Sequence, residues 1–188
     1  MVESSSNAAD AGQYYVVSLP EGQIYTQIRA WLLEVLPNEM RVITGQQNRM
    51  PAPKDPFATM VIINRERIST NASEYDGTST RTVKEQVKLN MQITLFGPAS
   101  SNQMQAVTAL WRDMHAVDFF RNQNVSIAPL YTSSVRQLGF ITGEKQYDDC
   151  WTVDLAMMVT IAIRTPQQFA SSITITLDEV VTAYPATE

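Results

Sequence analysis

The sequence predicts an α+β fold, a mostly antiparallel sheet with a long β-hairpin, flanked by two main helices. Residues 82–96 and 151–163 alternate between apolar and polar side chains, as pleated strands do because successive side chains point to opposite faces. Residues 21–36 and 100–117 instead repeat apolar side chains at steps of three and four, which is typical of a helix with one buried face.

The first helix is expected over residues 21–36, introduced by Pro20 and ended by Pro37-Asn38. Its apolar side consists of Ile24, Ile28, Trp31, Leu32 and Val35. Residues 41–43 predict a short strand. The three prolines within residues 46–56 exclude regular structure, so we expect a rigid, extended connection there.

Residues 57–63 are short, β-branched and apolar on both faces, which indicates a strand covered on two sides or lodged between subunits. Residues 69–82 are rich in Ser, Thr, Asn, Asp and Gly and predict the tip of the long hairpin. Its two antiparallel arms would be residues 57–68 and 83–96, which are longer than packing of one core requires.

The predicted strand over 82–96 leads directly into the second predicted helix. Gly97-Pro98 ends the strand, and Ser100 with Gln103 three residues later predicts a capping box. The helix stripe is Met104, Val107, Trp111, Met114 and Val117. A strand and a helix joined this closely are expected to pack against each other.

The rest of the chain is expected to add short elements and one long strand. Residues 118–120 close the second helix, and residues 123–143 predict loops with short strands around 127–128 and 140–141. The strand over 151–163 ends at Thr165-Pro166, and Ile173, Ile175 and Leu177 alternate once more. We expect a flexible leader over 1–12, a single domain over 13–182 and a flexible tail over 183–188.

Composition excludes several function classes. At 188 residues and 44% apolar content, the chain suits one domain with a sizeable core. A formal net charge of −5 without a basic stripe argues against binding nucleic acid through its phosphates. Neither a signal peptide nor an apolar run long enough to span a bilayer is visible, and the single cysteine fits a reducing compartment. These features predict a cytosolic, soluble protein.

Residues that could carry chemistry are few. His115 is the only histidine, so we interpret it as a helix residue at the edge of the apolar stripe. Cys150 has no cationic neighbour to activate it and is expected to be buried. The acidic residues Glu144, Asp148, Asp149 and Asp154 are expected in a solvated turn. Without a phosphate loop, a nucleophile elbow or a paired-cysteine motif, we predict no catalytic residue, no cofactor and no metal.

The order of these segments resembles the tail terminator or neck terminator proteins of long-tailed bacteriophages. The resemblance covers roughly residues 24–177. It includes Gln47–Pro53, Pro56–Ile62, Val87–Gly97 with Pro98, Leu110-Trp111, Phe119-Phe120 and Tyr147–Arg164. It implies a sheet flanked by helices, and six copies in a ring that caps the tail tube and stops its elongation. It also implies joining to the neck or head-completion protein and, in a contractile tail, contact with the sheath protein.

The same resemblance implies a virion protein at the tail–neck junction, assembled in the host bacterial cytoplasm, whose lumen passes DNA without specific binding. Six copies at −5 each would give the ring about −30, and like-charge repulsion would keep DNA sliding. Charge near the hairpin tip and the excess strand length predict the interface. Its residues are Arg65, Arg67, Arg81 and Lys84 at one rim, with Phe57, Val61 and Ile63 between subunits.

Two other hypotheses about function remain open at this point. One is another neck or tail ring protein, either a head-completion protein or a tube protein. The other is a cytosolic small-ligand binding module that uses aromatic residues such as Trp31, Trp111 and Trp151. From pattern alone, a single large sheet that closes on its two helices is as well supported as a sheet extended for assembly.

Overall fold

The computed structural model describes residues 15–46, 53, 56–77, 79–141 and 147–167. The fold is α+β, with one eight-stranded mixed sheet, a separate two-stranded sheet and three helices among the described residues. In chain order the elements are β1 (Val16–Val17), α1 (Glu21–Val35), β2 (Arg41–Thr44), β3 (Phe57–Arg67), β4 (Ala72–Tyr75), β5 (Thr80–Phe96), α2 (Ser100–Trp111), α3 (Met114–Asn122), β6 (Ile127–Thr132), β7 (Arg136–Gln137), β8 (Phe140–Ile141), β9 (Tyr147–Asp148) and β10 (Cys150–Pro166).

The centre of the large sheet is the antiparallel pair β5 and β10. These strands pair along 17 positions each, from Phe96 opposite Cys150 to Thr80 opposite Pro166. On the outer side of β5 lie β3 and β4, and β2 pairs in parallel with β3. On the outer side of β10 lie β1, β6 and β7. Only the β2–β3 pair is parallel among the described pairings, so the predicted dominance of antiparallel pairing agrees with the structure.

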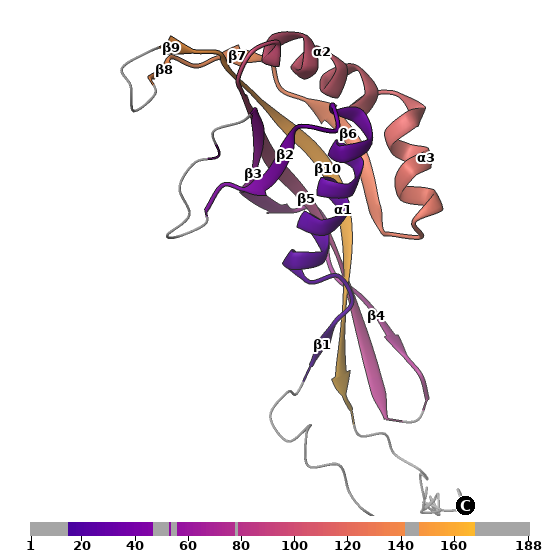
Figure 1. Cartoon of the computed structure of the whole chain (residues 1–188). Coiled ribbons are helices and arrows are strands. Elements are labelled where there is room, and N and C mark those ends of the chain that lie inside the picture. Colours follow the sequence, from indigo (N-terminus) through magenta and orange to yellow (C-terminus); the bar gives the residue numbers. More distant parts are fainter. Residues whose placement is uncertain (1–14, 47–52, 54–55, 78, 142–146, 168–188) are drawn as a thin grey trace, which may run out of the picture.

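All three helices lie on one face of this sheet (Figure 1). The core between the layers is continuous and includes apolar residues of α1 and α2 together with the odd-numbered residues 89–95 of β5 and 153–159 of β10. The largest fully buried side chains are Trp31, Trp111 and Phe120. Trp31 of α1 meets Trp111 of α2 edge to face, with ring centroids 5.0 Å apart, and this contact joins the helices to each other.

The structure corrects the prediction of one helix over residues 100–117. The chain leaves the helix after Trp111 and begins a new one at Met114, where Asp113 accepts a hydrogen bond from the backbone N–H of His115 at 3.0 Å. Such a cap marks the start of a new helix, because the side chain accepts a hydrogen bond from a backbone N–H in the first turn. As a result Met114, predicted in the buried stripe, is 56% exposed.

The predicted capping box is also wrong. Ser100 is the first residue of α2, and the cap position belongs to Ala99 in a left-handed conformation, with no side-chain hydrogen bond. The break itself lies where predicted. Gly97 has a φ of +104°, and a Cβ placed there would come 3.2 Å from the Cβ of Pro56. The turn therefore needs glycine both for its backbone conformation and for its close neighbour.

The expected hairpin has a more complex form. Residues of the two predicted arms do pair antiparallel, from Phe57 opposite Phe96 to Arg67 opposite Val87. The expected tip, however, contains β4, which pairs with β5 beyond the end of β3. The tight turn thus lies between β4 and β5, because residues 72–75 have a free stretch of β5 beside them to pair with.

One end of the sheet extends beyond the helices and is called the arm below. It consists of β1, β4, residues 80–86 of β5 and residues 160–166 of β10. Figure 1 shows these strands tapering away from the helical layer. Most of the expected connection over 46–56 lies outside the described residues. The expected leader, the expected tail and the alternation over 173–177 lie entirely outside them.

Candidate assembly interface

The register of the sheet gives its two faces different compositions. Odd-numbered residues of β5 and β10 point to the helices, and in the body of the molecule most of them are buried. Even-numbered residues point to the opposite face, called the open face below, most of which the described helices leave uncovered (Figure 1). Thr94, Thr152 and Ala156 are nevertheless buried there, and Met158 and Thr160 border a hollow shared with α3. Because a sheet normally buries at least one face and solvates or covers the other, the open face is a candidate contact surface.

The open face is mainly polar and cross-linked from strand to strand. Thr94 donates to Thr152 at 3.1 Å, and Thr152 donates in turn to the backbone carbonyl of Ile93 at 3.2 Å. One row further, Asp154 accepts from Gln92 at 3.3 Å and from the guanidinium of Arg136 at 3.0 Å. These bonds satisfy the polar groups within the chain and hold three strands in register.

Asp154, predicted in a solvated turn, is therefore part of a strand network. A second group on this face is Lys88, whose ammonium lies 3.4 Å from Glu66 and 5.5 Å from the ring centre of Tyr131. The pKa of Lys88 is raised above its ordinary value. The main cause is a hydrogen bond to the Tyr131 hydroxyl, and the charge interaction with Tyr131 and the contact with Glu66 add to it. Sequence reasoning missed both groups, since Arg136 and Tyr131 come from a segment without clear periodicity.

The four basic residues predicted for the rim are divided between the two faces. Arg65 and Arg67 pair opposite the odd-numbered residues Leu89 and Val87, so their side chains share the helix side of the sheet. Arg81 is itself an odd-numbered residue of β5 and points to the same side, whereas Lys84 points to the open face. Arg65 forms an ion pair with Glu21 at the start of α1. Lys84 forms another with Glu74, at 2.6 Å.

The other two rim residues bind neighbouring segments in the arm and at its base. The Nε of Arg67 donates to the carbonyl of Ser69 at 2.9 Å and lies 3.9 Å from Glu85. Arg81 donates to the hydroxyl of Ser73 at 3.1 Å, and its guanidinium lies 5.8 Å from the ring centre of Tyr75. The side-chain Nε of Arg81 is buried without a hydrogen-bond partner in the described structure.

The three predicted apolar interface residues differ in accessibility. Phe57 is buried and stacks on Phe96, with ring centroids 4.4 Å apart. Val61 is half-buried beside Gly45, where a Cβ would come within 2.5 Å of a Val61 methyl group. Ile63, at the bulge where β3 shifts register against β5, is 49% exposed. Of the three, only Ile63 offers a substantial apolar surface to another molecule.

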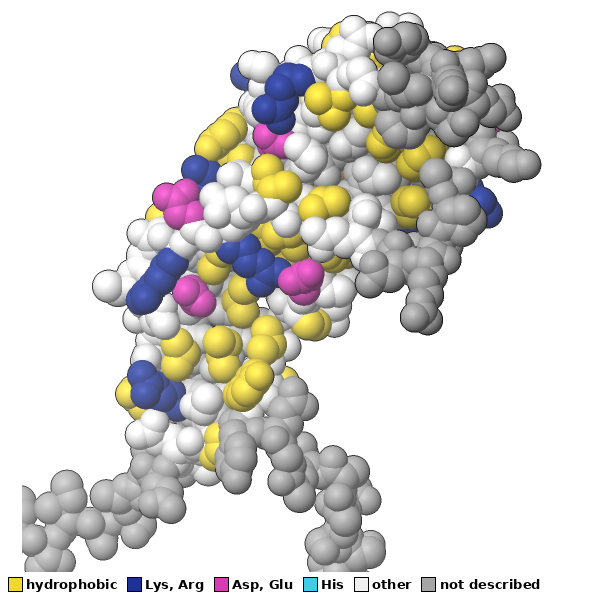
Figure 2. All heavy atoms as spheres, turned by 90° about the vertical axis from the view of Figure 1, so that its left-hand side faces the viewer, with side chains coloured by type: hydrophobic (Ala, Val, Ile, Leu, Met, Phe, Trp, Pro, Cys, Tyr) yellow, Lys and Arg dark blue, Asp and Glu magenta, His cyan; other side chains and the backbone are white. Residues whose placement is uncertain are grey.

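Other surfaces contain further exposed apolar residues. They include Val16, Ile68 and Tyr75 of or near the arm, and Leu130 and Tyr131 of β6. Figure 2 shows hydrophobic, basic and acidic side chains interspersed along the face it presents, rather than gathered into one patch of a single kind. This mixed character is common at protein–protein interfaces, which resemble the general surface in overall polarity.

His115 and Cys150, the two residues considered as possible reaction centres, are held within the fold. The Nδ1 of His115 accepts a hydrogen bond from the indole of Trp31 at 3.4 Å, and its Nε2 lies 3.7 Å from Glu34. Cys150 is buried, as predicted. Within the described ranges, no three His, Cys, Asp or Glu side chains are grouped so that they could hold a metal ion.

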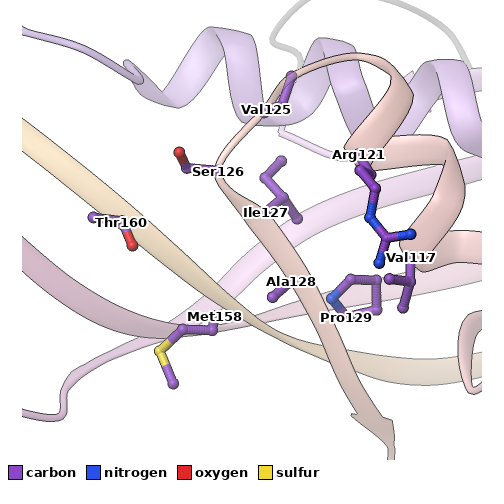
Figure 3. Close-up of a pocket in the computed structure, with 9 residues that line it drawn as sticks. All are labelled: Val117, Arg121, Val125, Ser126, Ile127, Ala128, Pro129, Met158 and Thr160. Atoms are coloured by element: carbon purple, nitrogen blue, oxygen red, sulfur yellow. The ribbon is translucent and has the colours of Figure 1, made fainter.

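The structure has a hollow of about 410 Å³ between α3, β6 and β10 (Figure 3). Val117 and Arg121 of α3 face residues 125–129 and the side chains of Met158 and Thr160. Its lining is mostly apolar, and Arg121, its only charged lining residue, pairs with Asp118 at 3.0 Å. None of the three tryptophans considered for ligand binding lines it.

The fold and these surfaces define a small α+β protein with an extended arm and a polar open face. None of the three described helices has the length and apolarity needed to cross a membrane. The sequence matches the family described as phage neck terminator protein over residues 22–180. The chain belongs to this family, whose members are structural proteins of the phage tail and neck.

One solved structure similar to this chain is the sheath/tube terminator of an extracellular contractile injection system, PVC, in its extended state. The two are 12% identical with a TM-score of 0.45, and the alignment covers 89% of this chain. This chain spans 65% of the length of that terminator. No curated protein sequence matches the chain.

Proposed function

We propose that this protein forms a homohexameric ring that caps the phage tail tube, stops its elongation and joins the tail to the neck. Its partners are further copies of itself, the tail tube protein and a head-completion or neck protein, with the sheath protein as a fourth in a contractile tail. DNA passes through the lumen without sequence-specific contacts. The ring is assembled in the host cytoplasm and remains in the virion at the tail–neck junction.

The observation that carries this proposal is the family match over residues 22–180, which spans all three helices and most of the sheet. The arm adds physical support. Its strands lie beyond the helical layer, and an antiparallel ribbon without a covering layer is weakly stable by itself. Packing against a neighbouring subunit would supply the missing cover, as expected for an element used in assembly.

The predicted interface residues fit this proposal in different ways. Ile63 offers exposed apolar surface, and Arg65, Arg67, Arg81 and Lys84 present partly exposed cationic groups along the arm and its base. Phe57 and Val61 are placed to support β3 from within the chain. We therefore assign the subunit contact to Ile63 and the arm, with the four basic residues at its rim.

Charge supports the passage of DNA. Six copies carry a formal charge of about −30, six times the −5 of one chain. A net negative ring repels the phosphate backbone at short range, so that DNA is not held as it passes.

The experiment that tests the proposal is disruption of the gene in its phage, followed by negative-stain electron microscopy of the particles. Overlong tails without heads are the expected result, because an uncapped tube continues to polymerise. Tails of normal length that fail to join heads would instead place the protein one ring further up the neck. Normal infectious particles would contradict any role in the virion. Complementation with the intact gene is the control.

A further inference from the structure

The sheet has two side edges, one formed by β3 and the other by β6. Beyond residue 60, β3 lies past the end of β2, because β2 pairs only with residues 57–60. On the opposite side, β6 lies along the outer side of β10. The order β3, β5, β10, β6 puts three strand spacings, about 15 Å, between the two edges. They are too far apart to touch within one chain, so a contact between them joins two copies.

The β3 edge carries two exposed isoleucines. Ile63, 49% exposed, lies at the bulge between Ile62 and Asn64, where β3 shifts its register against β5. Ile68, 48% exposed, follows the end of β3. A bulge takes a side chain out of the regular alternation of a strand and re-aims it. This edge therefore offers two apolar side chains to another molecule.

The β6 edge carries the hollow of about 410 Å³ (Figure 3). Val117 and Met158 are among its apolar lining residues, and Ser126 and Ala128, which also line it, are exposed. The hollow is thus open to solvent. Its volume lies within the range of about 300 to 1,000 Å³ that encloses small ligands, so it has room for apolar side chains. Filling it with them removes apolar surface from water on both partners.

The register of the sheet places the isoleucines and the hollow at the same height along the strands. Ile63 lies beside the row of Ala156. Ile68 donates its backbone N–H to β5 at 3.2 Å and lies in the row of Thr160. Met158 and Thr160 line the hollow, so it occupies the same rows. A second copy, turned about an axis parallel to the strands, brings its isoleucines to the hollow without sliding along them.

The isoleucines and the hollow belong to different surfaces, so a contact between them is heterologous. Each copy uses its β3 edge toward one neighbour and its β6 edge toward the next. Heterologous contacts generate a closed ring when the rotation between copies closes, and an open filament when it does not. An edge-to-edge contact of this kind therefore suits the proposed ring.

The charges beside the two apolar surfaces are complementary. Arg65, Arg67 and Glu66 lie next to the isoleucines, and Asp118 and Arg121 lie next to the hollow. These five side chains are between 41% and 67% exposed. The two arginines of β3 complement Asp118, and Glu66 complements Arg121. Both edges thus offer partners for both signs of charge around an apolar centre.

We propose that Ile63 and Ile68 of one copy pack into the hollow between α3, β6 and β10 of the next copy and anchor the contact between subunits. This assignment rests on the proposed function for the existence of the ring, and it adds the surface that receives the β3 edge. Apolar side chains at the centre, with a charged and solvent-accessible rim around them, are the usual arrangement of a protein interface.

Disulfide crosslinking in assembled tails tests the contact. Ile63→Cys or Ile68→Cys is combined with Ser126→Cys or Ala128→Cys, and the buried Cys150 is retained. A disulfide requires Cα atoms within about 7 Å, so a bond between the two edges forms only between copies. After mild oxidation of purified particles, at least one combination should give a ladder of crosslinked species that ends at six copies.

Leu138→Cys with Ala128→Cys is the matched control. Leu138 is 45% exposed, but its backbone N–H donates to the carbonyl of Cys150, at the opposite end of β10 from the hollow. This pair should crosslink at least about tenfold more slowly. Absence of a ladder in all four combinations would overturn the proposal. A crosslink to the tube protein in place of a second copy, or a dimer formed by Ile63→Cys alone, would overturn it too.

Filling the hollow gives an independent test. Ala128→Trp, at an exposed position, should leave the urea midpoint unchanged but reduce complementation of the disrupted phage at least about tenfold. The reason is that the hollow no longer admits the side chains of the neighbouring copy. Leu138→Trp, also at an exposed position, should complement within about threefold of the unchanged gene. Equal complementation by the two variants would count against the proposed contact.

The two proposals fail in distinguishable ways. Overlong tails after gene disruption, together with no crosslink in the complemented particles, would support the terminator role and overturn only the contact. Tails of normal length after disruption, together with a crosslinked ladder, would overturn the terminator role and support the contact between copies.

Discussion

The indole N–H of Trp111, near the end of α2, donates a hydrogen bond at 3.2 Å to the backbone carbonyl of Ala156, which lies in the middle of β10. Both residues are buried. The bond fixes the helical layer to the long strand that continues into the arm. A buried polar contact thus links the helical layer to the strand that continues into the arm.

This contact gives the first prediction. Trp111→Phe retains most of the packing but leaves the Ala156 carbonyl without its donor, which should lower the free energy of unfolding by about 1 to 3 kcal/mol. Trp111→Ala also creates a cavity and should cost about 3 to 5 kcal/mol. Urea denaturation measures both. Leu33→Ala, at an exposed helix position, is the control and should stay within about 0.5 kcal/mol.

The turn at Gly97 gives a second prediction, with an opposite effect at another glycine. Gly97→Ala should destabilise the protein by about 1 to 3 kcal/mol, because φ is +104° and the new Cβ would press on Pro56. Gly22→Ala, in α1 with nothing within 4 Å, should stabilise it by about 0.5 to 1 kcal/mol. Thermal unfolding distinguishes the two, and equal shifts would contradict the assigned turn conformation.

The third prediction concerns the start of α3. Asp113→Ala removes the side chain that accepts from the N–H of His115, so the free energy of unfolding should fall by about 1 kcal/mol. Asp118→Ala in the same helix loses only an exposed ion pair with Arg121 and should cost less than about 0.5 kcal/mol. Chemical denaturation of both variants measures the difference. A larger loss at Asp118 would argue against the assigned cap.

The fourth prediction follows from the raised pKa of Lys88, for which the Tyr131 hydroxyl is the main cause. The stabilisation belongs to the charged form, so it is fully present below the ordinary pKa of 10.5 and is lost only as the pH rises through the raised value. Tyr131→Phe should therefore lower the pKa of Lys88 more than Glu66→Gln does. NMR titration of the Lys88 side chain checks this order, and the reverse order would contradict the assignment.

The fifth prediction tests the rim. Arg65→Glu with Arg67→Glu should reduce complementation of the disrupted phage by about a hundredfold, because like charges placed across an interface cost several kcal/mol. Both arginines are partly exposed and in ion pairs, so folding itself should lose only about 0 to 1 kcal/mol for each. Plaque counts and ring formation are the measurements. The exposed Arg112→Glu is the control, and intact rings with normal tail joining in the double variant would rule out the rim.

Local patterns in the sequence determined the long elements. The alternation over 82–96 and 151–163 predicts β5 and the greater part of β10, because a sheet with one buried face requires an apolar residue at every second position. The stripe over 21–36 predicts α1 for the same reason at helical spacing. The buried position of Cys150 and the break at Gly97 also follow from residue type and near neighbours.

Tertiary structure decided what no local pattern contains. The pairing of β5 with β10 joins residues that are 54 to 86 positions apart, from Phe96 with Cys150 to Thr80 with Pro166, and their shared length is what forms the arm. The division of α2 from α3 depended on the hydrogen bond by which Asp113 caps α3, and the strand within the expected hairpin tip depended on the part of β5 with which β4 pairs. The same holds for the four basic residues of the rim. Their charge is visible in the sequence, but the sheet register decides that Lys84 faces one side and Arg81 the other.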